Sequence, residues 1–353
     1  METRQEQVVD GIEDEDDVRS IILQLKNSEI NHPWRFEEID LGHIGNQELI
    51  VRLVISLVRK ATALRFYNCT LPTLFYRSLA DCLRRGNKDS LRELGFLCFH
   101  DDITMVMEAI KMNRQLTTVE LNEIACINDS NVVFEIIESN PALQVLDLSF
   151  NVLGDDFVNG VAAALDRARG KTRLRRISLH DCEFGDEGLT ALSNVIGADP
   201  LVRDDNGTKV YGLRLQELMV DHNSFTDDGM MALQAALRTV KRNNANVLRM
   251  FPPNYLPRYC DDERIEQRIL SCLHRNRTLE GLDRLKQERE PSAAWCYAIS
   301  RPRPRHADLV FWLLKQTAHL LETGGSATPD LPPPFEHLQD EDGMVTTVRQ
   351  PDR

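Results

Sequence analysis

Residues Leu143–Asn151 read LQVLDLSFN, and this segment decides the fold because close copies of it recur along the chain. Aliphatic residues at its first, fourth and sixth positions and a polar residue at its ninth recur in Leu174–Cys182, LRRISLHDC, and in Leu215–Asn223, LQELMVDHN. After each copy the apolar residues continue with helical spacing. The pattern predicts a unit of a short strand, a turn and an α-helix, repeated along the chain.

An acidic pair precedes the helix expected in each of these units: Asp155-Asp156, Asp186-Glu187 and Asp227-Asp228. Carboxylates at the start of a helix accept hydrogen bonds from free backbone N–H groups and oppose the positive end of the helix dipole. We therefore interpret these pairs as caps and not as catalytic carboxylates.

Weaker copies flank the three central units. They begin at Phe36, Ala61, Leu91 and Leu116 upstream and at Val247 downstream, so that successive units start 25 to 41 residues apart. The longest unit carries an extra loop, residues 197–212, which contains a polar turn, Asp204 to Gly207.

The motif with a helix in every unit resembles the leucine-rich-repeat family of the ribonuclease-inhibitor-like type, and the resemblance covers about Trp34 to Leu282. It implies an α/β leucine-rich-repeat solenoid, a horseshoe with a parallel sheet on the concave face and α-helices on the convex face. That family includes ribonuclease inhibitor, the sensing arms of NOD-like receptors and the GTPase-activating protein for Ran.

The resemblance also assigns a role to the ninth position, where the family's Asn or Cys bonds backbone carbonyls inside the turn. Cys69 and Cys182 occupy that position, so a packing role accounts for them without reactivity. Ile44, Phe99 and Ile124 depart from the pattern, which implies that those units close their turns by other means or are framed differently.

The same pattern divides the chain into four segments. Residues 1–33 are expected to form an acidic N-terminal segment with a capping helix over Val18–Leu25, and residues 34–283 the repeats. Residues 284–322 are expected to form a C-terminal helical cap, although its most apolar part, residues 307–322, could instead dock a partner. Residues 323–353, rich in Gly, Pro and acids, predict a disordered tail.

Strand alternation predicts which side chains face the concavity, because successive residues of a strand point to opposite faces. The predicted protein-binding residues are Asp40, Arg65, Tyr67, Glu93, Glu120, Asp147, Arg176, His180, Glu217, Met219, Asp221 and Arg249. This mostly acidic surface suits a protein partner with basic patches, for which charge sets the association rate and specificity.

The sequence therefore predicts a protein–protein interaction module that acts as a scaffold, sensor or inhibitor. The alternative is a GTPase-activating protein of the Ran type, for which Arg65 and Arg176 are the candidate arginines. No catalytic motif is present, so we expect no enzymatic activity and no cofactor.

A metal site is conceivable where His180 and His222 lie on neighbouring repeats beside Asp181 and Asp221. The sequence spells out no tetrahedral ligand set, so surface histidines without a metal are the expectation.

Composition limits the partners and the location. Lys and Arg number 42 against 55 Asp and Glu, a formal net charge of −13, which argues against nucleic acid and anionic membranes as partners. No apolar run approaches the roughly 20 residues of a spanning helix, and the acidic N-terminus does not resemble a signal peptide. The eight cysteines form no C-x-x-C pair, which argues against zinc-ribbon and thioredoxin-like sites. Scattered thiols without a signal peptide indicate a reducing compartment, so we expect the protein in the cytoplasm or nucleus. We also expect a monomer.

Overall fold

The protein is described from a computed structural model that covers residues 6–239, apart from 29–31, 87–89, 126, 128–130, 199–200, 204–208, 212 and 214, together with residues 269 and 272. The chain forms two compact units, Met1–Arg277 and Thr278–Arg353, and the described residues all belong to the first. Arg249, the predicted cap 284–322 and the predicted tail 323–353 lie outside the described residues.

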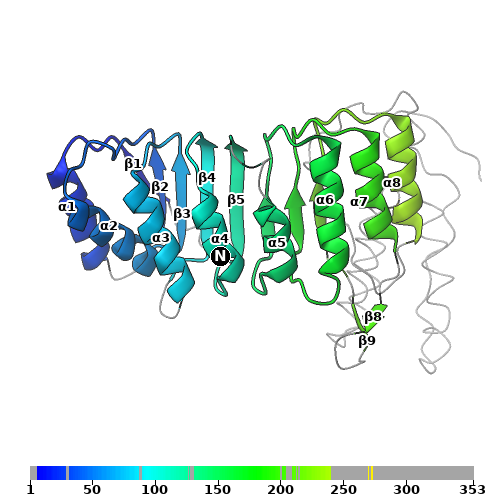
Figure 1. Ribbon diagram of the computed structural model, residues 1–353, viewed down its shortest axis with the longest axis horizontal. Coiled ribbons are helices and arrows are strands. Elements are labelled where there is room, and N and C mark those ends of the chain that lie inside the picture. Colours follow the sequence, from blue (N-terminus) through cyan, green and yellow to red (C-terminus); the bar gives the residue numbers. More distant parts are fainter. Residues whose placement is uncertain are drawn as a thin grey trace, which may run out of the picture. The chain divides into compact units, whose positions relative to one another are not determined.

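One parallel sheet runs through the first unit (Figure 1). Its eight strands lie in chain order, and they are β1 (Gln7–Asp10), β2 (Pro33–Glu37), β3 (Ala63–Tyr67), β4 (Glu93–Phe99), β5 (Thr118–Ile124), β6 (Val145–Asp147), β7 (Arg176–Ser178) and β10 (Glu217–Met219). Each strand pairs in parallel with the next, which is the topology expected when every connection returns through a helix.

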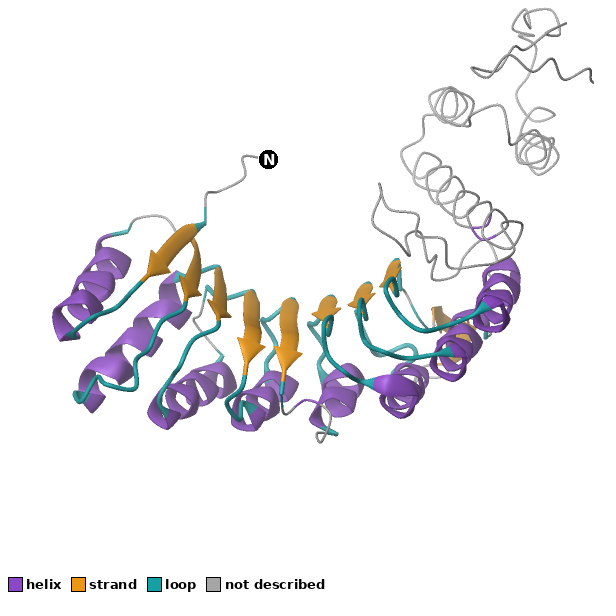
Figure 2. Cartoon of the chain, turned by 90° about the horizontal axis from the view of Figure 1, so that it is seen from above, coloured by secondary structure: helices purple, strands orange, loops and turns teal. Residues whose placement is uncertain are grey.

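A helix follows every strand of this sheet. The helices are α1 (Glu15–Asn27), α2 (Gln47–Lys60), α3 (Thr73–Arg85), α4 (Thr104–Met112), α5 (Val132–Ser139), α6 (Gly154–Arg167), α7 (Asp186–Gly197) and α8 (Asp227–Thr239). Figure 2 shows the helices along one face of the sheet, and consecutive helices pack side by side. The predicted α/β solenoid is confirmed, whereas its horseshoe curvature stays a prediction.

The core lies between the sheet and the helix layer and is continuous from α1 to α8. Three rings on neighbouring strands stack within it: Phe36 on Phe66, with centroids 5.3 Å apart, and Phe66 on Phe96, at 5.5 Å. These residues are also partners in the strand register. Because each ring is almost fully buried, the stack stabilises this register over alternatives that would break it.

The predicted frame of the first upstream repeat is wrong by five residues. Trp34 and Phe36 are the buried strand residues, not Ile39 and Leu41, because Phe36 pairs with Phe66. Ile39 follows the strand and takes the place that Cys69 has in the next repeat, as the bridge between Asp40 and Thr70 shows. Apolar residues alternate in the predicted frame and in the observed frame alike, and the aromatic stack stabilises the observed one.

The N-terminal segment contains more than a capping helix. Helix α1 includes the expected residues Val18–Leu25 and starts at a capping box in which Asp14 and Asp17 bond each other's backbone N–H groups. Strand β1, which pairs with β2 at the edge of the sheet, was not predicted. Its four residues carry no clear alternation, since Val8 is exposed and Val9 packs on the core.

The extra loop of the longest unit contains a short antiparallel pair, β8 (Leu201–Arg203) and β9 (Lys209–Tyr211), which is separate from the main sheet. The predicted turn residues between these strands lie outside the described residues. Across the described part of the chain, no helix combines the length and the apolar character needed to cross a membrane.

Candidate functional site

The sheet face turned away from the helices, here called the open face, bears most of the predicted binding residues. Strand register places on this face Arg65, Tyr67, Glu93, Glu120, Asp147, Arg176, Glu217 and Met219. Strand alternation was a sufficient signal for these positions. His180 and Asp221 lie just beyond the ends of β7 and β10. Asp221 is only 2 % exposed, so the prediction that its side chain contacts a protein partner is wrong.

The prediction for Asp40 is wrong, because it followed the mistaken frame of the first repeat. Asp40 lies after β2, and its Oδ1 accepts a hydrogen bond from the Gly42 N–H at 2.7 Å. The side chains that β2 does present on the open face are Arg35 and Glu37, which form an ion pair of 2.6 Å. The Arg35 guanidinium also lies over the Tyr67 ring, 5.9 Å from its centroid.

Arg65 is the centre of an ion-pair cluster at the N-terminal end of the open face. Its Nε donates to Glu120 at 2.8 Å, one Nη to Glu93 at 2.7 Å and the other Nη to Glu6 at 3.2 Å. Hydrogen bonding to Glu120, against the opposing effect of burial, raises the pKa of Arg65 above its ordinary value. The cluster therefore joins strands that are not neighbours in the sheet.

Gly95 makes the link between Arg65 and Glu120 possible. It lies on β4, between β3 and β5, in register with both residues. A Cβ there would come within 3.0 Å of a Glu120 carboxylate oxygen and 3.3 Å of Arg65 Cγ. A strand glycine of this kind marks a close approach of other groups over the backbone.

Polar contacts also hold the C-terminal end of the open face. Arg176 and Glu217 form an ion pair of 3.3 Å between neighbouring strands. Asp147 accepts a hydrogen bond of 2.6 Å from the Ser149 hydroxyl, and Ser149 lies 2.7 Å from the Ser178 hydroxyl. The Asp147 carboxylate is thus partly occupied by its neighbours, while the Arg176 side chain is exposed.

A row of left-handed residues lies at or near the C-terminal ends of the strands, and no sequence pattern predicted it. From β2 to β10 along the sheet, φ lies between 49° and 62° at Glu38, Asn68, Cys98, Glu123, Phe150, Asp181 and His222. Cys98 and Glu123 lie within β4 and β5, and the other five residues follow their strands. None is a glycine, the usual signal for positive φ, so residue type gave little indication of the turn.

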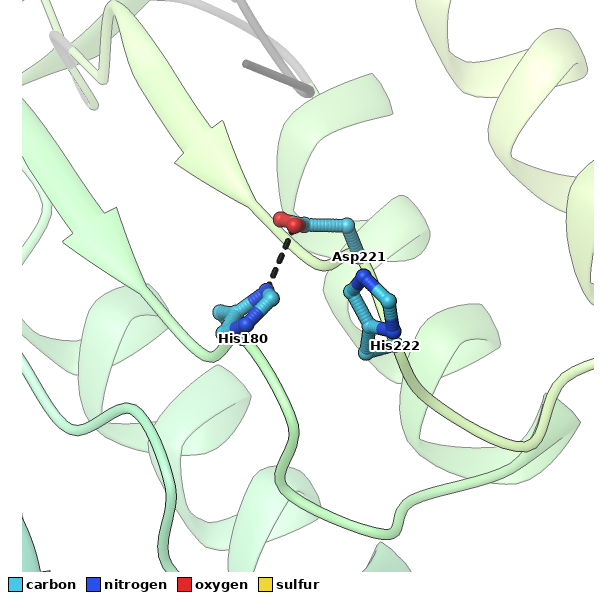
Figure 3. Close-up of side chains that lie close together, drawn as sticks. All are labelled: His180, Asp221 and His222. Atoms are coloured by element: carbon cyan, nitrogen blue, oxygen red, sulfur yellow. Dashed lines mark hydrogen bonds and ion pairs between the residues drawn. The ribbon is translucent and has the colours of Figure 1, made fainter. Parts of the chain in front are cut away.

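One part of this edge brings two imidazoles and a carboxylate together (Figure 3). His180 Nδ1 lies 2.5 Å from Asp221 Oδ2, and the ring centroids of His180 and His222 are 4.8 Å apart. Phe150 packs edge-on against His180, also at 4.8 Å between centroids. Asp181, which the sequence placed beside these histidines, is exposed and is not in the cluster.

Buried side chains inside the turns position these strand ends. Asn151 donates to the Leu121 and Leu148 carbonyls at 2.7 Å each, and Asn223 donates to Leu179 and Val220 at 2.8 Å. The role that the family resemblance implied for the ninth position is therefore present in these units.

Cys69 and Cys182 act at the same position, as expected. The Cys182 thiol donates to the Leu148 carbonyl at 3.3 Å, and the Cys69 thiol to that of Phe36 at 3.4 Å. Burial raises the pKa of Cys182 to about 12 and also raises that of Cys69, so both stay protonated at neutral pH. Where Phe99 and Ile124 replace the polar residue, they pair with each other and extend β4 and β5.

Buried asparagines also occur at another position of the repeat, between a helix and the following strand, and they were not predicted from the sequence. Asn113 and Asn140 donate to the Leu83 and Ile110 carbonyls of the preceding helices at 2.7 Å each. Each side-chain oxygen accepts two backbone N–H groups of its own connection. The two asparagines are 27 residues apart, one repeat, which is a signal that the sequence did contain.

In two of the three acidic pairs the first acid caps a helix, but the helix belongs to the next repeat. Asp155 Oδ1 accepts the N–H groups of Gly185 and Gly188, at the start of α7, at 2.9 and 2.7 Å. Asp186 does the same for Thr226 and Gly229, at the start of α8, at 2.7 and 3.0 Å. These carboxylates join neighbouring units and hold their helix starts in register.

Comparison with known families supports the assignment of the three central units as leucine-rich repeats. A family model described as "Leucine Rich repeat" matches residues 139–156, 171–193 and 215–233. Each match spans a turn or strand described above and part of the helix that follows it. No curated protein matches the chain in sequence.

Proposed function

Because the chain is a leucine-rich-repeat protein, and such repeats generally mediate protein–protein interaction, we propose that its open face binds a protein partner. The partner carries basic patches, and the protein serves as a scaffold, sensor or inhibitor without catalysing a reaction. This role requires no nucleic acid, membrane or cofactor.

The observation that supports this proposal is the open face itself. The sheet is eight strands wide, and the described helices all lie on its other face, so that none of them covers the open face. An extended surface of this kind is what repeat proteins use for large ligands. Acidic side chains outnumber arginines on it, and Arg35, Arg65 and Arg176 are each already paired with a glutamate. The remaining negative charge favours a basic protein surface.

The subtype and the setting are further parts of the proposal. A full α-helix of 8 to 14 residues in every described unit favours the ribonuclease-inhibitor-like class. The described cysteines are all free thiols, in keeping with a reducing compartment such as the cytoplasm or nucleus. A monomer would leave the open face available, on the concave side of a horseshoe, to the partner.

The alternative, a GTPase-activating protein of the Ran type, has less support. An arginine that stabilises phosphoryl transfer has to reach the nucleotide. Arg65 is held by three carboxylates and Arg176 by one, so either would first have to leave its partners. The rate of GTP hydrolysis by Ran, with and without this protein, tests this alternative directly, and unchanged hydrolysis is the expected result.

Charge reversal with a matched control tests binding by the open face. The variant Glu93→Lys with Glu217→Lys removes two glutamates that pair with arginines across strands. The control, Glu48→Lys with Asp81→Lys, removes two acids that pair with arginines on the helices. Both pairs of substitutions change the net charge equally and break two ion pairs, of which those in the control are the more exposed.

The measurement is affinity capture from the native cell, quantified by mass spectrometry for the wild type and both variants. We expect a basic protein that is retained by the wild type and the helix-face control and lost from the open-face variant. Equal retention by both variants would place the binding surface elsewhere and overturn the proposal.

A further inference from the structure

We propose that His180, Asp221 and His222 bind a divalent transition-metal ion, with Zn²⁺ as the representative ion. The site lies at the edge of the open face, and the proposal does not depend on a protein partner.

The backbone brings the three side chains to one place. His180 and Asp221 follow neighbouring strands, and the Asp181 N–H donates to the Asp221 carbonyl at 3.0 Å, so the two segments run side by side. In extended backbone, His222 would point away from Asp221, to the opposite face. The left-handed conformation of His222, φ 58°, breaks this alternation, and its ring lies 4.8 Å from that of His180.

The geometry suits a metal ion with three protein ligands. One nitrogen of each imidazole and one carboxylate oxygen lie within 4.8 Å of one another (Figure 3). Zinc binds nitrogen and carboxylate oxygen at about 2.0–2.2 Å, so ligand atoms around one ion are separated by more than 3 Å. Small side-chain rotations would bring the three atoms to such an arrangement, leaving a fourth position to solvent.

A second observation, independent of this clustering, points to a cation. Asp221 is only 2 % exposed, and its Oδ1 is buried with no hydrogen-bond partner among the described residues. Leaving a buried carboxylate oxygen unpaired is unfavourable, and a bound ion is one of the explanations for such an atom. His180 contacts only Oδ2, so this hydrogen bond does not account for Oδ1.

The surroundings hold the ligands in place. Phe150 packs against His180 on the side of the preceding repeat, and Asn223, the next residue but one after Asp221, is fixed in its turn by bonds to Leu179 and Val220. Imidazole and carboxylate together are the ligand set of zinc and of other first-row divalent ions, whereas magnesium prefers oxygen ligands.

The test is a titration of the metal-free, full-length protein with Zn²⁺, followed by calorimetry, with Mg²⁺ as the negative ion. The variants are His222→Ala and Asp221→Asn, and the matched control is His100→Ala. His222 and His100 are both exposed imidazoles in loops after strands, so their removal leaves the core intact. Circular dichroism reports that each variant is folded.

We expect one Zn²⁺ per chain at this site, with affinity reduced by about 10-fold or more in His222→Ala and Asp221→Asn and unchanged in His100→Ala. X-ray absorption of the zinc-loaded wild type should show nitrogen and oxygen ligands that include two imidazoles. Absence of zinc binding, equal binding by all variants, or thiolate ligands in the absorption spectrum would each overturn the proposal.

Discussion

Asn151 holds two neighbouring repeats together with one side chain. Its amide donates to carbonyls of both its own repeat and the previous one, and its Oδ1 accepts the Ile124 N–H at 2.7 Å. The side chain is buried, with 3 % of the residue exposed, so no water replaces these bonds easily. Buried backbone N–H and C=O groups that have no partner strand thus find their hydrogen bonds in the Asn151 side chain.

We therefore expect Asn151→Ala to lower the free energy of unfolding by about 1–3 kcal/mol, because it leaves buried backbone groups without partners. Urea denaturation followed by circular dichroism measures this. The control is Asn159→Ala, which removes a side chain that donates to Glu187 on the surface and should change stability by no more than about 0.5 kcal/mol. Equal effects of the two variants would contradict the assigned role.

Asp186 connects repeats by charge as well as by hydrogen bonds. Partial burial opposes its ionisation, but bonds from Thr226 and Gly229 outweigh it, so that the pKa lies below the ordinary value of 3.8. A carboxylate with a depressed pKa stabilises the folded state above the pKa of the unfolded state. That contribution is lost as the pH falls through the lower, folded-state value.

We expect Asp186→Asn to lower the free energy of unfolding by about 0.5–1 kcal/mol at neutral pH, as a lost helix cap does. The difference from the wild type should shrink as denaturation is repeated at pH values that fall below 3.8 and through the lower, folded-state pKa, where the wild-type carboxylate also becomes neutral. Asp156→Asn, at an exposed position in the first turn of α6, is the control. A difference that stays constant down to acidic pH would exclude a role for the charge.

The sequence of strand β4 is adapted to an ion pair that crosses over it. Most positions of a strand favour β-branched residues, and glycine weakens a strand. Gly95 nevertheless lies in the middle of β4, where it leaves room for Arg65 of β3 to reach Glu120 of β5. The ion pair across the sheet, and not strand propensity, explains the residue.

Gly95→Val should accordingly lower the free energy of unfolding by about 1–2 kcal/mol, because the new side chain displaces a partly buried, charged hydrogen bond. In an Arg65→Met background the same substitution should be neutral or stabilising, since no ion pair remains to be displaced. A double-mutant cycle by urea denaturation measures this coupling. The same loss in both backgrounds would mean that valine clashes with something other than the ion pair.

The net charge of the whole molecule affects the rate at which it associates with a partner. The net charge is −13, and the acidic part of the open face adds a local negative field for basic surfaces. Charges of this kind raise the association rate more than they lower the dissociation rate.

For the partner identified by capture, we expect the association rate constant to fall roughly 10-fold or more as salt rises from low to high ionic strength. Stopped-flow fluorescence measures this rate. The variant Glu93→Lys with Glu217→Lys should bind more slowly at low salt and depend less on salt. An association rate that does not change with ionic strength would show that charge does not steer the encounter.

Local patterns determined the parts of the fold that depend on neighbouring residues. Strand alternation and helical spacing are periodic over a few positions, so Leu143–Asn151 and its copies were enough to predict the central strands, their helices and the side chains of the open face. The role of Cys69 and Cys182 followed from the same alignment.

Only the tertiary structure decided the features that arise between repeats. The frame of the first unit depends on Phe36 stacking on Phe66, the acid of one unit caps the helix of the next, and His180 meets Asp221 across 41 positions. Each of these contacts joins residues about one repeat apart in the sequence. A local pattern carries no information about which side chains meet, because stacking of the units on a shared core brings them together.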